Sequence, residues 1–260
     1  MNNKIALSIV THNSKHIFKV LDNLRAELGD NSEYEVHIFD NNSDKDYIAR
    51  LQTYEPFIVL QQHKENRGFG YGHNQVFKEA AAQYGIIFNP DVLVSKQAMD
   101  SMIQRIRENE QVALICPKVL NYDGTIQYLV RQKLDVFDYM LRFVPIHFVK
   151  KIFDKRLAYY ECRDLPEDKT SYIKMGSGCF MVIDVEKYNE IQGFDERFFM
   201  YFEDNDLCLR FGQKGYKILY TPFETVTHLY EKGAHKNMKL FNIFMQSMFR
   251  FFNKWGWRFF

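Results

Sequence analysis

The chain has 260 residues, of which 46% are hydrophobic, and this composition indicates a globular protein rather than a disordered one. Lys and Arg total 34 and Asp and Glu total 33, so the net charge of +1 provides no overall attraction to nucleic acid, and we expect no nucleic-acid partner. The four cysteines form no CxxC pair and none has a histidine at a zinc-like spacing, which favours reduced, mostly buried thiols.

The first half of the chain alternates between predicted strands and predicted helices. Short apolar runs rich in β-branched residues predict the strands, and apolar residues at helical spacing predict the helices, the first of them capped by Ser14. The expected strands cover residues 5–10, 35–39, 57–60, 85–88 and 112–116, and the expected helices cover residues 15–28, 71–84 and 96–109. This alternation predicts an α/β fold, with a mostly parallel central sheet and helices on both faces.

The second half is less regular. Expected strands cover residues 172–175, 179–183 and 217–220, and expected helices cover residues 185–191, 204–213 and the tail from about residue 238. No internal repeat or linker is visible, so we expect one interrupted domain over residues 1–230 and a C-terminal helical appendage over residues 231–260. The apolar run from Ile5 to Val10 is too short for a signal peptide or a membrane span, which predicts a cytoplasmic location.

Polar clusters follow three of the predicted strands, at the edge where α/β sheets bind ligands. They are Thr11-His12-Asn13, Asp40-Asn41-Asn42-Ser43 and Asn89-Pro90-Asp91. The carboxylate of Asp40 could accept the ring N–H of a pyrimidine, or it could start an Asx turn. The carboxylate of Asp91, held by a proline turn, suits a hard divalent cation, and a simple β-turn is the alternative.

A glycine-rich run, Asn66-Arg67-Gly68-Phe69-Gly70-Tyr71-Gly72-His73-Asn74, precedes a predicted helix. Its backbone N–H groups could approach a phosphate closely, and Arg67 would add positive charge. The glycine spacing is GxGxG, which argues against the GxGxxG fingerprint of dinucleotide-binding folds. A flexible surface loop is the alternative interpretation.

Five acids lie within residues 195–206, interleaved with aromatic residues. Glu203, Asp204 and Asp206 stand where a helix is predicted to begin, and the helix dipole favours negative charge there. Helix capping explains one or two of these acids, but not the apolar run Phe198–Phe202 directly before them. A carboxylate beside an apolar wall can act as a general base.

In their order along the chain, these motifs resemble family 2 glycosyltransferases of the GT-A fold and, among them, the rhamnosyltransferase-like subgroup. The resemblance extends from Ile5 to about His228, and Asn89-Pro90-Asp91 and the last block are typical of the subgroup. The matching segments are Ser8-Ile9-Val10-Thr11-His12-Asn13, Asp40-Asn41-Asn42-Ser43, residues 66–74, Asn89-Pro90-Asp91, Gly124-Thr125-Ile126-Gln127, Gly176-Ser177-Gly178-Cys179 and residues 193–210.

The resemblance implies roles for particular positions. It implies that Asp204 is the general base, with Glu203 beside it as a second catalytic residue. It also implies that Asp91 and His228 bind Mg²⁺ or Mn²⁺. For His228 the alternative is an ordinary structural residue, which a lone histidine more often is. It implies a donor nucleotide half over about residues 1–117 and an acceptor half over about residues 118–230. The implied acceptor-binding residues are Gly178 and Asp206, and the implied donor-binding residues are Thr11, Asn13, Asp40, Asn42, Arg67, Gly68, Asn74 and Asn89.

The implied reaction is a single displacement that inverts the anomeric centre of a nucleotide-diphosphate sugar, with L-rhamnose from a dTDP donor favoured. The implied acceptor is a surface polysaccharide or a lipid-linked oligosaccharide. One departure is that Asn89 replaces the first acid of the common DxD metal motif. One alternative is a sugar-1-phosphate nucleotidylyltransferase, although residues 5–14 lack the glycine-rich signature expected of it. The other is an inactive membrane-bound scaffold, although Asp40, Asp91 and Asp204 are intact.

The C-terminal segment from Met238 to Phe260 is amphipathic. Most of its residues are apolar or aromatic, and the polar ones form one narrow stripe: Lys239, Asn242, Gln246, Arg250 and Asn253. Together with the basic and aromatic stretch 137–160, this pattern favours a helix lying on the inner surface of an anionic membrane. The alternative is that the helix packs on the domain or on a second subunit.

Overall fold

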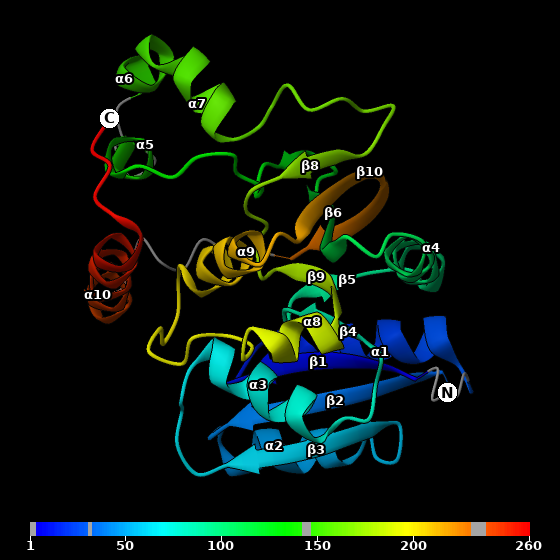
Figure 1. Cartoon of the computed structure of the whole chain (residues 1–260). Coiled ribbons are helices and arrows are strands. Elements are labelled where there is room, and N and C mark those ends of the chain that lie inside the picture. Colours follow the sequence, from blue (N-terminus) through cyan, green and yellow to red (C-terminus); the bar gives the residue numbers. More distant parts are fainter. Residues whose placement is uncertain (1–3, 31–32, 142–146, 230–237) are drawn as a thin grey trace.

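The computed structural model describes residues 4–30, 33–141, 147–229 and 238–260. Its centre is a ten-stranded sheet with the strand order β3-β2-β1-β4-β9-β6-β10-β5, to which β7 is added beside β6 and β8 beside β10 (Figure 1). The strands are β1 (Ile5–Thr11), β2 (Tyr34–Asn41), β3 (Ile58–His63), β4 (Tyr84–Phe88), β5 (Val92–Leu93), β6 (Val112–Asn121), β7 (Ile126–Gln127), β8 (Ser171–Ile173), β9 (Phe180–Asp184) and β10 (Lys217–His228).

The α/β fold is confirmed, but the sheet is mixed rather than mostly parallel. Strands β3, β2, β1 and β4 are parallel to one another, as predicted. Strand β9 is antiparallel to both of its neighbours, β4 and β6, and β10 is parallel to β6 but antiparallel to β5 and β8. The long connection after β6 returns to the sheet at the end where β6 finishes, so β9 must run in the opposite direction.

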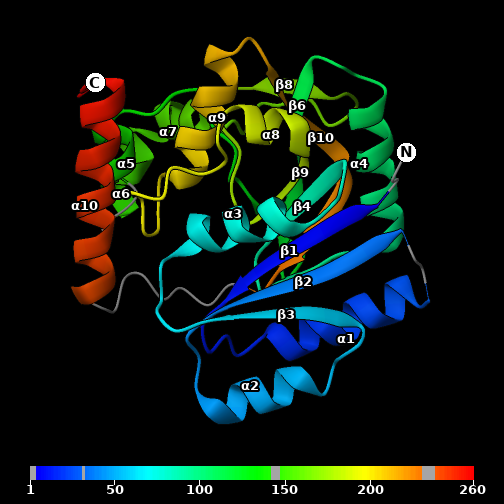
Figure 2. The ribbon, with the colours of Figure 1, turned by 60° about the horizontal axis from the view of Figure 1, so that its bottom comes forward.

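Helices cover both faces of the sheet. Ile5, Leu7 and Ile9 of β1 point into a core shared with α1, α2 and α4, whereas Ala6 points into a second core shared with α3, α8, α9 and α10. Figure 2 shows α1 and α2 on one side of β1–β3 and α3 on the other. The four cysteines are free and buried, as predicted. The helices are α1 (Ile17–Leu28), α2 (Lys45–Gln52), α3 (Phe69–Glu79), α4 (Lys96–Arg107), α5 (Val136–Leu141), α6 (His147–Ile152), α7 (Asp154–Tyr160), α8 (Val185–Glu190), α9 (Glu203–Gln213) and α10 (Met238–Trp255).

Three element boundaries differ from prediction in ways that affect the site. Helix α3 begins at Phe69 inside the glycine-rich run and ends at Glu79, so residues 80–83 are not helical. The N-cap of α1 is His16 rather than Ser14, and the Ser14 hydroxyl accepts a 3.4 Å hydrogen bond from the His16 N–H. Strand β10 continues past residue 220 through a register shift, so that His228 is its last residue.

The C-terminal helix is part of the second core, which is the packing alternative considered for it. Phe244, Met248, Phe251 and Phe252 of α10 are buried there. The chain after α10 is also attached, because the Val136 N–H donates a 2.8 Å hydrogen bond to the carbonyl oxygen of residue 258. The expected domain boundary near residue 230 lies outside the described residues. None of the helices in the described ranges is long and apolar enough to cross a membrane.

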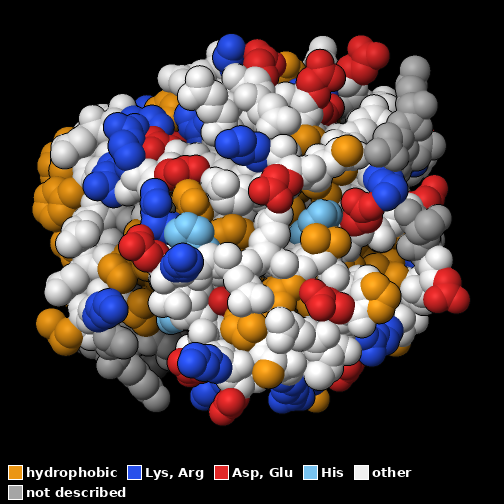
Figure 3. Space-filling model, turned by 90° about the horizontal axis from the view of Figure 1, so that it is seen from below, with side chains coloured by type: hydrophobic (Ala, Val, Ile, Leu, Met, Phe, Trp, Pro, Cys, Tyr) orange, Lys and Arg blue, Asp and Glu red, His pale blue; other side chains and the backbone are white. Residues whose placement is uncertain are grey.

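The surface reflects the balanced charge of the sequence. On the face shown in Figure 3, Lys and Arg side chains are interspersed with Asp and Glu side chains. This face therefore carries charges of both signs rather than one extended basic field.

Candidate active site

A cavity of about 760 Å³ lies at the carboxyl ends of β1, β2 and β4. Strand-end residues such as Thr11, Asn41 and Asn89 form one side of it. The segments Gly176–Cys179 and Phe199–Asn205 form the opposite side. Other lining residues are His228, residues of the first turns of α10, Gln127, Leu129, Arg131, Tyr139 and Tyr160. The cavity is therefore at the sheet edge where the sequence predicted a ligand site.

Asp91 and His228 meet at one wall of this cavity. The antiparallel pairing of β5 with β10 places Val92 opposite His228, so the residue before β5 comes next to the imidazole. His228 Nε2 lies 3.2 Å from Asp91 Oδ1. On the other side of the ring, His228 Nδ1 lies 2.9 Å from Gln127 Oε1, which fixes the orientation of the imidazole.

These two residues fit part of a divalent metal site. The carboxylate oxygen of Asp91 and the imidazole nitrogen of His228 lie close together. Gln127 orients the imidazole from its other side, as hydrogen-bond partners of metal-binding histidines commonly do. No group of three or more His, Cys, Asp or Glu side chains with metal-ligand geometry occurs within the ranges that the structure describes. A metal at Asp91 and His228 would therefore complete its coordination with oxygens from a substrate and water.

The carboxylates at the start of α9 lie in the same cavity. Asp204 Oδ2 accepts a hydrogen bond from the Gly178 N–H at 3.0 Å, and Oδ1 accepts from the N–H and the side-chain amide of Asn205 at 2.7 and 2.8 Å. Burial raises the pKa of Asp204, and these backbone donors oppose the rise. Gly178, which was predicted to bind the acceptor, lines the same cavity and donates its backbone N–H to Asp204.

Glu203 has a contrasting environment. It is 6% exposed, and its Oε2 has no hydrogen-bond partner among the residues that the structure describes. Burial, and then the charge of Asp204, raises the pKa of Glu203 well above its ordinary range. Of the two neighbouring carboxyl groups, Asp204 is therefore the one that carries a negative charge more readily.

The backbone before α9 is strained. Tyr201 and Phe202 both have positive φ angles, 72° and 67°, which non-glycine residues seldom adopt. Phe202 is buried and stacks on Tyr139, with ring centres 4.7 Å apart, and this packing holds the turn that presents Glu203 and Asp204. Strain of this kind is concentrated at functional sites.

Asp40 is buried at the end of β2, paired in register with Thr11 of β1. One carboxylate oxygen, Oδ2, accepts a 2.9 Å hydrogen bond from the Ser43 N–H, so the predicted Asx turn is present. The other, Oδ1, is buried and has no hydrogen-bond partner within the described residues. A turn explains the first oxygen only, so the second is the one that could receive a ligand N–H.

The remaining strand-end residues divide between the cavity and the surface. Thr11 and Asn89 line the cavity, whereas Asn13 and Asn42 are turn residues with positive φ, and Asn13 bonds to Ser43 and Asp44. Asn41 has a role that its sequence motif did not indicate. Its side-chain amide donates to the Gly68 carbonyl at 3.0 Å and accepts from the Arg67 N–H at 3.2 Å, and it lines the cavity.

The glycine-rich run packs against the segment before α9. Gly68 has a φ of 92°, and a Cβ there would lie 2.2 Å from the Phe199 carbonyl oxygen, so only glycine fits. Gly68 lines the cavity, but the structure does not bring Arg67 or Asn74 to it. The Arg67 guanidinium stacks on Tyr71, and Asn74 Oδ1 accepts from the Phe194 N–H at 2.8 Å.

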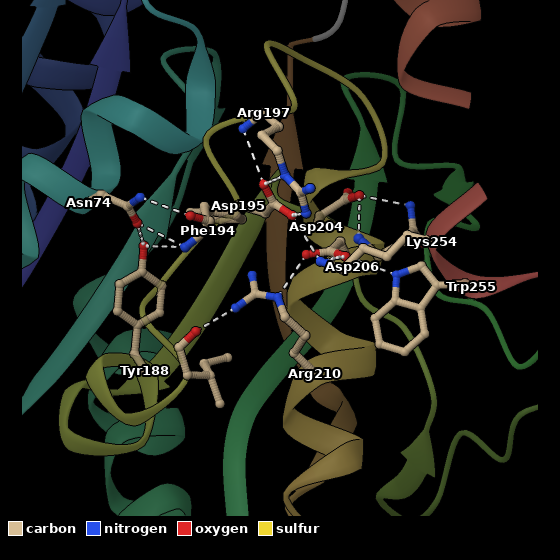
Figure 4. A network of polar contacts seen from close by, with 12 residues as sticks. Asn74, Tyr188, Phe194, Asp195, Arg197, Asp204, Asp206, Arg210, Lys254 and Trp255 are labelled. Atoms are coloured by element: carbon tan, nitrogen blue, oxygen red, sulfur yellow. Dashed lines mark hydrogen bonds and ion pairs between the residues drawn. The ribbon is translucent and has the colours of Figure 1, made fainter. Parts of the chain in front are cut away.

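Asp206 is directed away from the cavity, contrary to the expectation that it contacts an acceptor. It is completely buried and joins α9 to α10 (Figure 4). Its carboxylate accepts hydrogen bonds from Arg210 Nε at 2.7 Å and Trp255 Nε1 at 2.8 Å, and Lys254 Nζ lies 2.6 Å away. Lys254 also contacts Asp195 at 2.9 Å, so one lysine connects both ends of the segment that leads into α9.

The mixed α/β sheet, with acids and amides around a cavity at its carboxyl edge, has the architecture of a GT-A glycosyltransferase. Two solved structures show the same fold. GalNAc-T7, in complex with UDP, GalNAc and Mn²⁺, superposes with a TM-score of 0.64 at 13% identity, over 88% of this chain and 43% of that one. A mannosyltransferase from Pyrobaculum calidifontis, in complex with GDP-Man and Mn²⁺, gives a TM-score of 0.62 at 15% identity, over 89% of this chain and 58% of that one.

Residues 7–190 match the glycosyl transferase family 2 domain, and the chain belongs to that family. Residues 166–235 also match a domain described as the N-terminal domain of galactosyltransferase. The rhamnosyltransferase WbbL of Escherichia coli is 24% identical over 259 residues, 95% of this chain and 92% of the relative. The N-acetylglucosaminyl-diphospho-decaprenol L-rhamnosyltransferase of Mycobacterium tuberculosis is 26% identical over 209 residues, 74% of this chain and 66% of the relative.

The chain is therefore a glycosyltransferase that resembles rhamnosyltransferases, as its motifs predicted. Membership of this family also sets aside the nucleotidylyltransferase alternative.

Proposed function

We propose that the protein transfers L-rhamnose from dTDP-rhamnose to a lipid-linked or surface glycan, in one displacement that inverts the anomeric centre. The observation that carries this proposal is the placement of Asp204 in one cavity with the Asp91–His228 pair. The names of the two relatives, both rhamnosyltransferases, favour rhamnose as the sugar.

Asp204 is the proposed base that accepts the proton of the acceptor hydroxyl. Three N–H donors stabilise its charged form, whereas burial and the neighbouring charge raise the pKa of Glu203 well above its ordinary range. Two carboxyl groups whose environments separate their pKa values can take different roles. Glu203 would then shape the site and limit the negative charge beside the base.

Asp91 and His228 are the proposed holders of Mg²⁺ or Mn²⁺. The metal, when bound, would neutralise the diphosphate that leaves the sugar. Both superposed structures are complexes with Mn²⁺, which supports a divalent metal without choosing between Mg²⁺ and Mn²⁺. The contributions of this chain are the carboxylate of Asp91, the imidazole of His228 and the amide of Gln127 that orients the imidazole.

The donor nucleotide is proposed to lie against the ends of β1 and β2. The free Oδ1 of Asp40 could accept the ring N–H of a pyrimidine. Thr11, Gly68 and Asn89 line the same cavity as Asp91 and His228, where a sugar diphosphate would lie. Asn13, Asn42, Arg67 and Asn74 support the surrounding loops.

A lipid-linked acceptor is proposed to reach the site from the cytoplasmic surface of a membrane. Phe148 and Ile152 of α6 are 72% and 61% exposed, and Lys151 between them is exposed as well. Apolar side chains with an adjacent cation suit an anionic lipid surface. We therefore propose the contact on α6 rather than on α10, whose apolar face is buried in the core.

The test is a transfer assay with purified protein, Mn²⁺ and a panel of dTDP-, UDP- and GDP-sugars. The acceptor is a lipid-diphosphate-linked N-acetylglucosamine, chosen from the mycobacterial relative's name. We expect transfer from dTDP-rhamnose, with NMR of the product showing an anomeric configuration opposite to that of the donor. Retention of the configuration would contradict the mechanism, and transfer from another donor only would contradict the proposed sugar.

A further inference from the structure

Arg131 is a buried arginine of the cavity wall that forms no ion pair with any carboxylate of the described residues. It is only 5% exposed. Nη1 donates hydrogen bonds to the carbonyl oxygens of Tyr128 at 2.6 Å and Val130 at 2.7 Å, and the guanidinium lies 4.5 Å from the centre of the Tyr160 ring. These contacts fix the position of the guanidinium, but none of them neutralises it.

Other partly buried arginines of the chain are paired with acids. Arg156 bonds to Asp135 and Asp138, and Arg210 bonds to Asp206 at 2.7 Å. A guanidinium remains charged in proteins, and burying it without a counter-charge is costly. An unmatched guanidinium at the wall of a substrate cavity therefore indicates an anionic ligand.

The free donors of Arg131 have the geometry for such a ligand. Its Nε and Nη2 donate to no residue within the described ranges, and these two N–H groups lie side by side on one edge of the guanidinium. That edge can bind two oxygens of a phosphate at once. A lone hydroxyl would use this edge less fully, because it offers one oxygen and no negative charge.

The position of Arg131 associates it with the acceptor rather than with the donor. Arg131 and the proposed base Asp204 line the same cavity, and the positive charge of Arg131 opposes the rise that burial causes in the pKa of Asp204. Asp204 already accepts from Gly178 and Asn205, and it does not use the free donors of Arg131. The donor diphosphate is proposed to bind elsewhere, at Asp91 and His228.

The walls near Arg131 suit a sugar that is attached to a lipid. Aromatic rings can stack on the apolar face of a sugar, and aliphatic side chains can contact the first part of a lipid chain. The residues of these kinds that line the cavity are Tyr139, Tyr160, Tyr201, Leu240 and Ile243. We infer that Arg131 binds the sugar-linked phosphate of an acceptor carried on a lipid diphosphate, an inference that rests on the function proposed above.

The test compares kcat/KM for two acceptors that carry the same sugar and the same alkyl chain. One is joined through a diphosphate and the other through a plain glycosidic bond. The wild-type protein should prefer the diphosphate acceptor by about 10- to 100-fold, the range expected for a hydrogen-bonded charge pair. Arg131→Gln should remove most of this preference, and Arg131→Lys should keep part of it, because the charge remains without the fork.

Arg163→Gln is the matched control. Arg163 is paired with Asp154 and Glu161 and lies outside the cavity lining, so its replacement should leave the preference as in the wild type. Melting curves of each variant show whether it is folded.

Three outcomes would contradict the inference. If Arg131→Gln lowers kcat/KM for both acceptors by the same factor, Arg131 acts on the base or on the fold and not on a phosphate. If the wild-type protein does not distinguish the two acceptors, the inference is wrong even if the variants fail to fold. If the wild-type protein transfers a sugar to neither acceptor, the proposed function fails, and the inference fails with it.

Discussion

Replacing Asp206 by asparagine tests whether its carboxylate joins α10 to the active-site helix. The amide keeps the shape of the side chain but removes the charge at a fully buried position, so Arg210 loses its carboxylate partner and Lys254 keeps only Asp195. Removing one partner of a buried ion pair costs about 3–5 kcal/mol. At about 2–4 °C per kcal/mol for a chain of this size, Asp206→Asn should lower the Tm by about 6–20 °C. Thermal unfolding followed by circular dichroism measures this.

Lys214→Ala is the control for that experiment. Lys214 forms an exposed pair with Glu190, with side chains 50% and 43% accessible, and such pairs contribute about 0–1 kcal/mol. The control should therefore lower the Tm by only a few degrees at most. If Asp206→Asn costs no more than Lys214→Ala, the buried network does not attach α10, and the reasoning about Asp206 is refuted.

Three further predictions concern the loop, the metal pair and the C-terminal helix. Gly68→Ala should destabilise the fold by about 1–3 kcal/mol in denaturant titrations, because the added Cβ would lie 2.2 Å from the Phe199 carbonyl oxygen. Gly124→Ala should destabilise the fold less, because Gly124 also has a positive φ but has open space around it, and equal losses of stability would argue against the close contact. Asp91→Ala should weaken dTDP binding, measured by calorimetry, far more in Mn²⁺ than in EDTA; an equal loss in both would make Asp91 a turn residue. Deleting residues 238–260 removes four buried apolar side chains, whose burial contributes about 6–12 kcal/mol in total to the free energy of folding, and should therefore prevent folding. A truncated protein that melts cooperatively would contradict the packing of α10.

The parallel half of the sheet and its polar strand ends could be predicted from the sequence, because strand and helix periodicities are local properties. The direction of β9 could not, because it depends on which end of the sheet the long connection after β6 returns to. The burial of one face of α10 was left open for a similar reason. An amphipathic helix shows that one face is covered, but not whether protein or lipid covers it.

Within the site, helix geometry separates residues that the motif groups together. Asp204 and Asp206 are two residues apart, so on a helix of 3.6 residues per turn they point about 200° apart. Asp204 therefore lines the cavity while Asp206 faces α10, a distinction that the helical spacing alone could have indicated. The position of Arg131 in the cavity wall could not be predicted from its local sequence, because its backbone pairs with that of Met175, far along the chain.

The most direct test of the central claim is transfer by the Asp204→Asn protein. The amide preserves the shape of the side chain but cannot accept the acceptor's proton, so kcat should fall on the order of 10²–10⁴-fold while the Kd for dTDP in Mn²⁺ stays within about 2-fold of the wild type. Glu203→Gln, measured in parallel, should lose much less, because the proposed mechanism assigns no proton transfer to Glu203. Transfer by Asp204→Asn at the wild-type rate would contradict the assignment of Asp204 as the base.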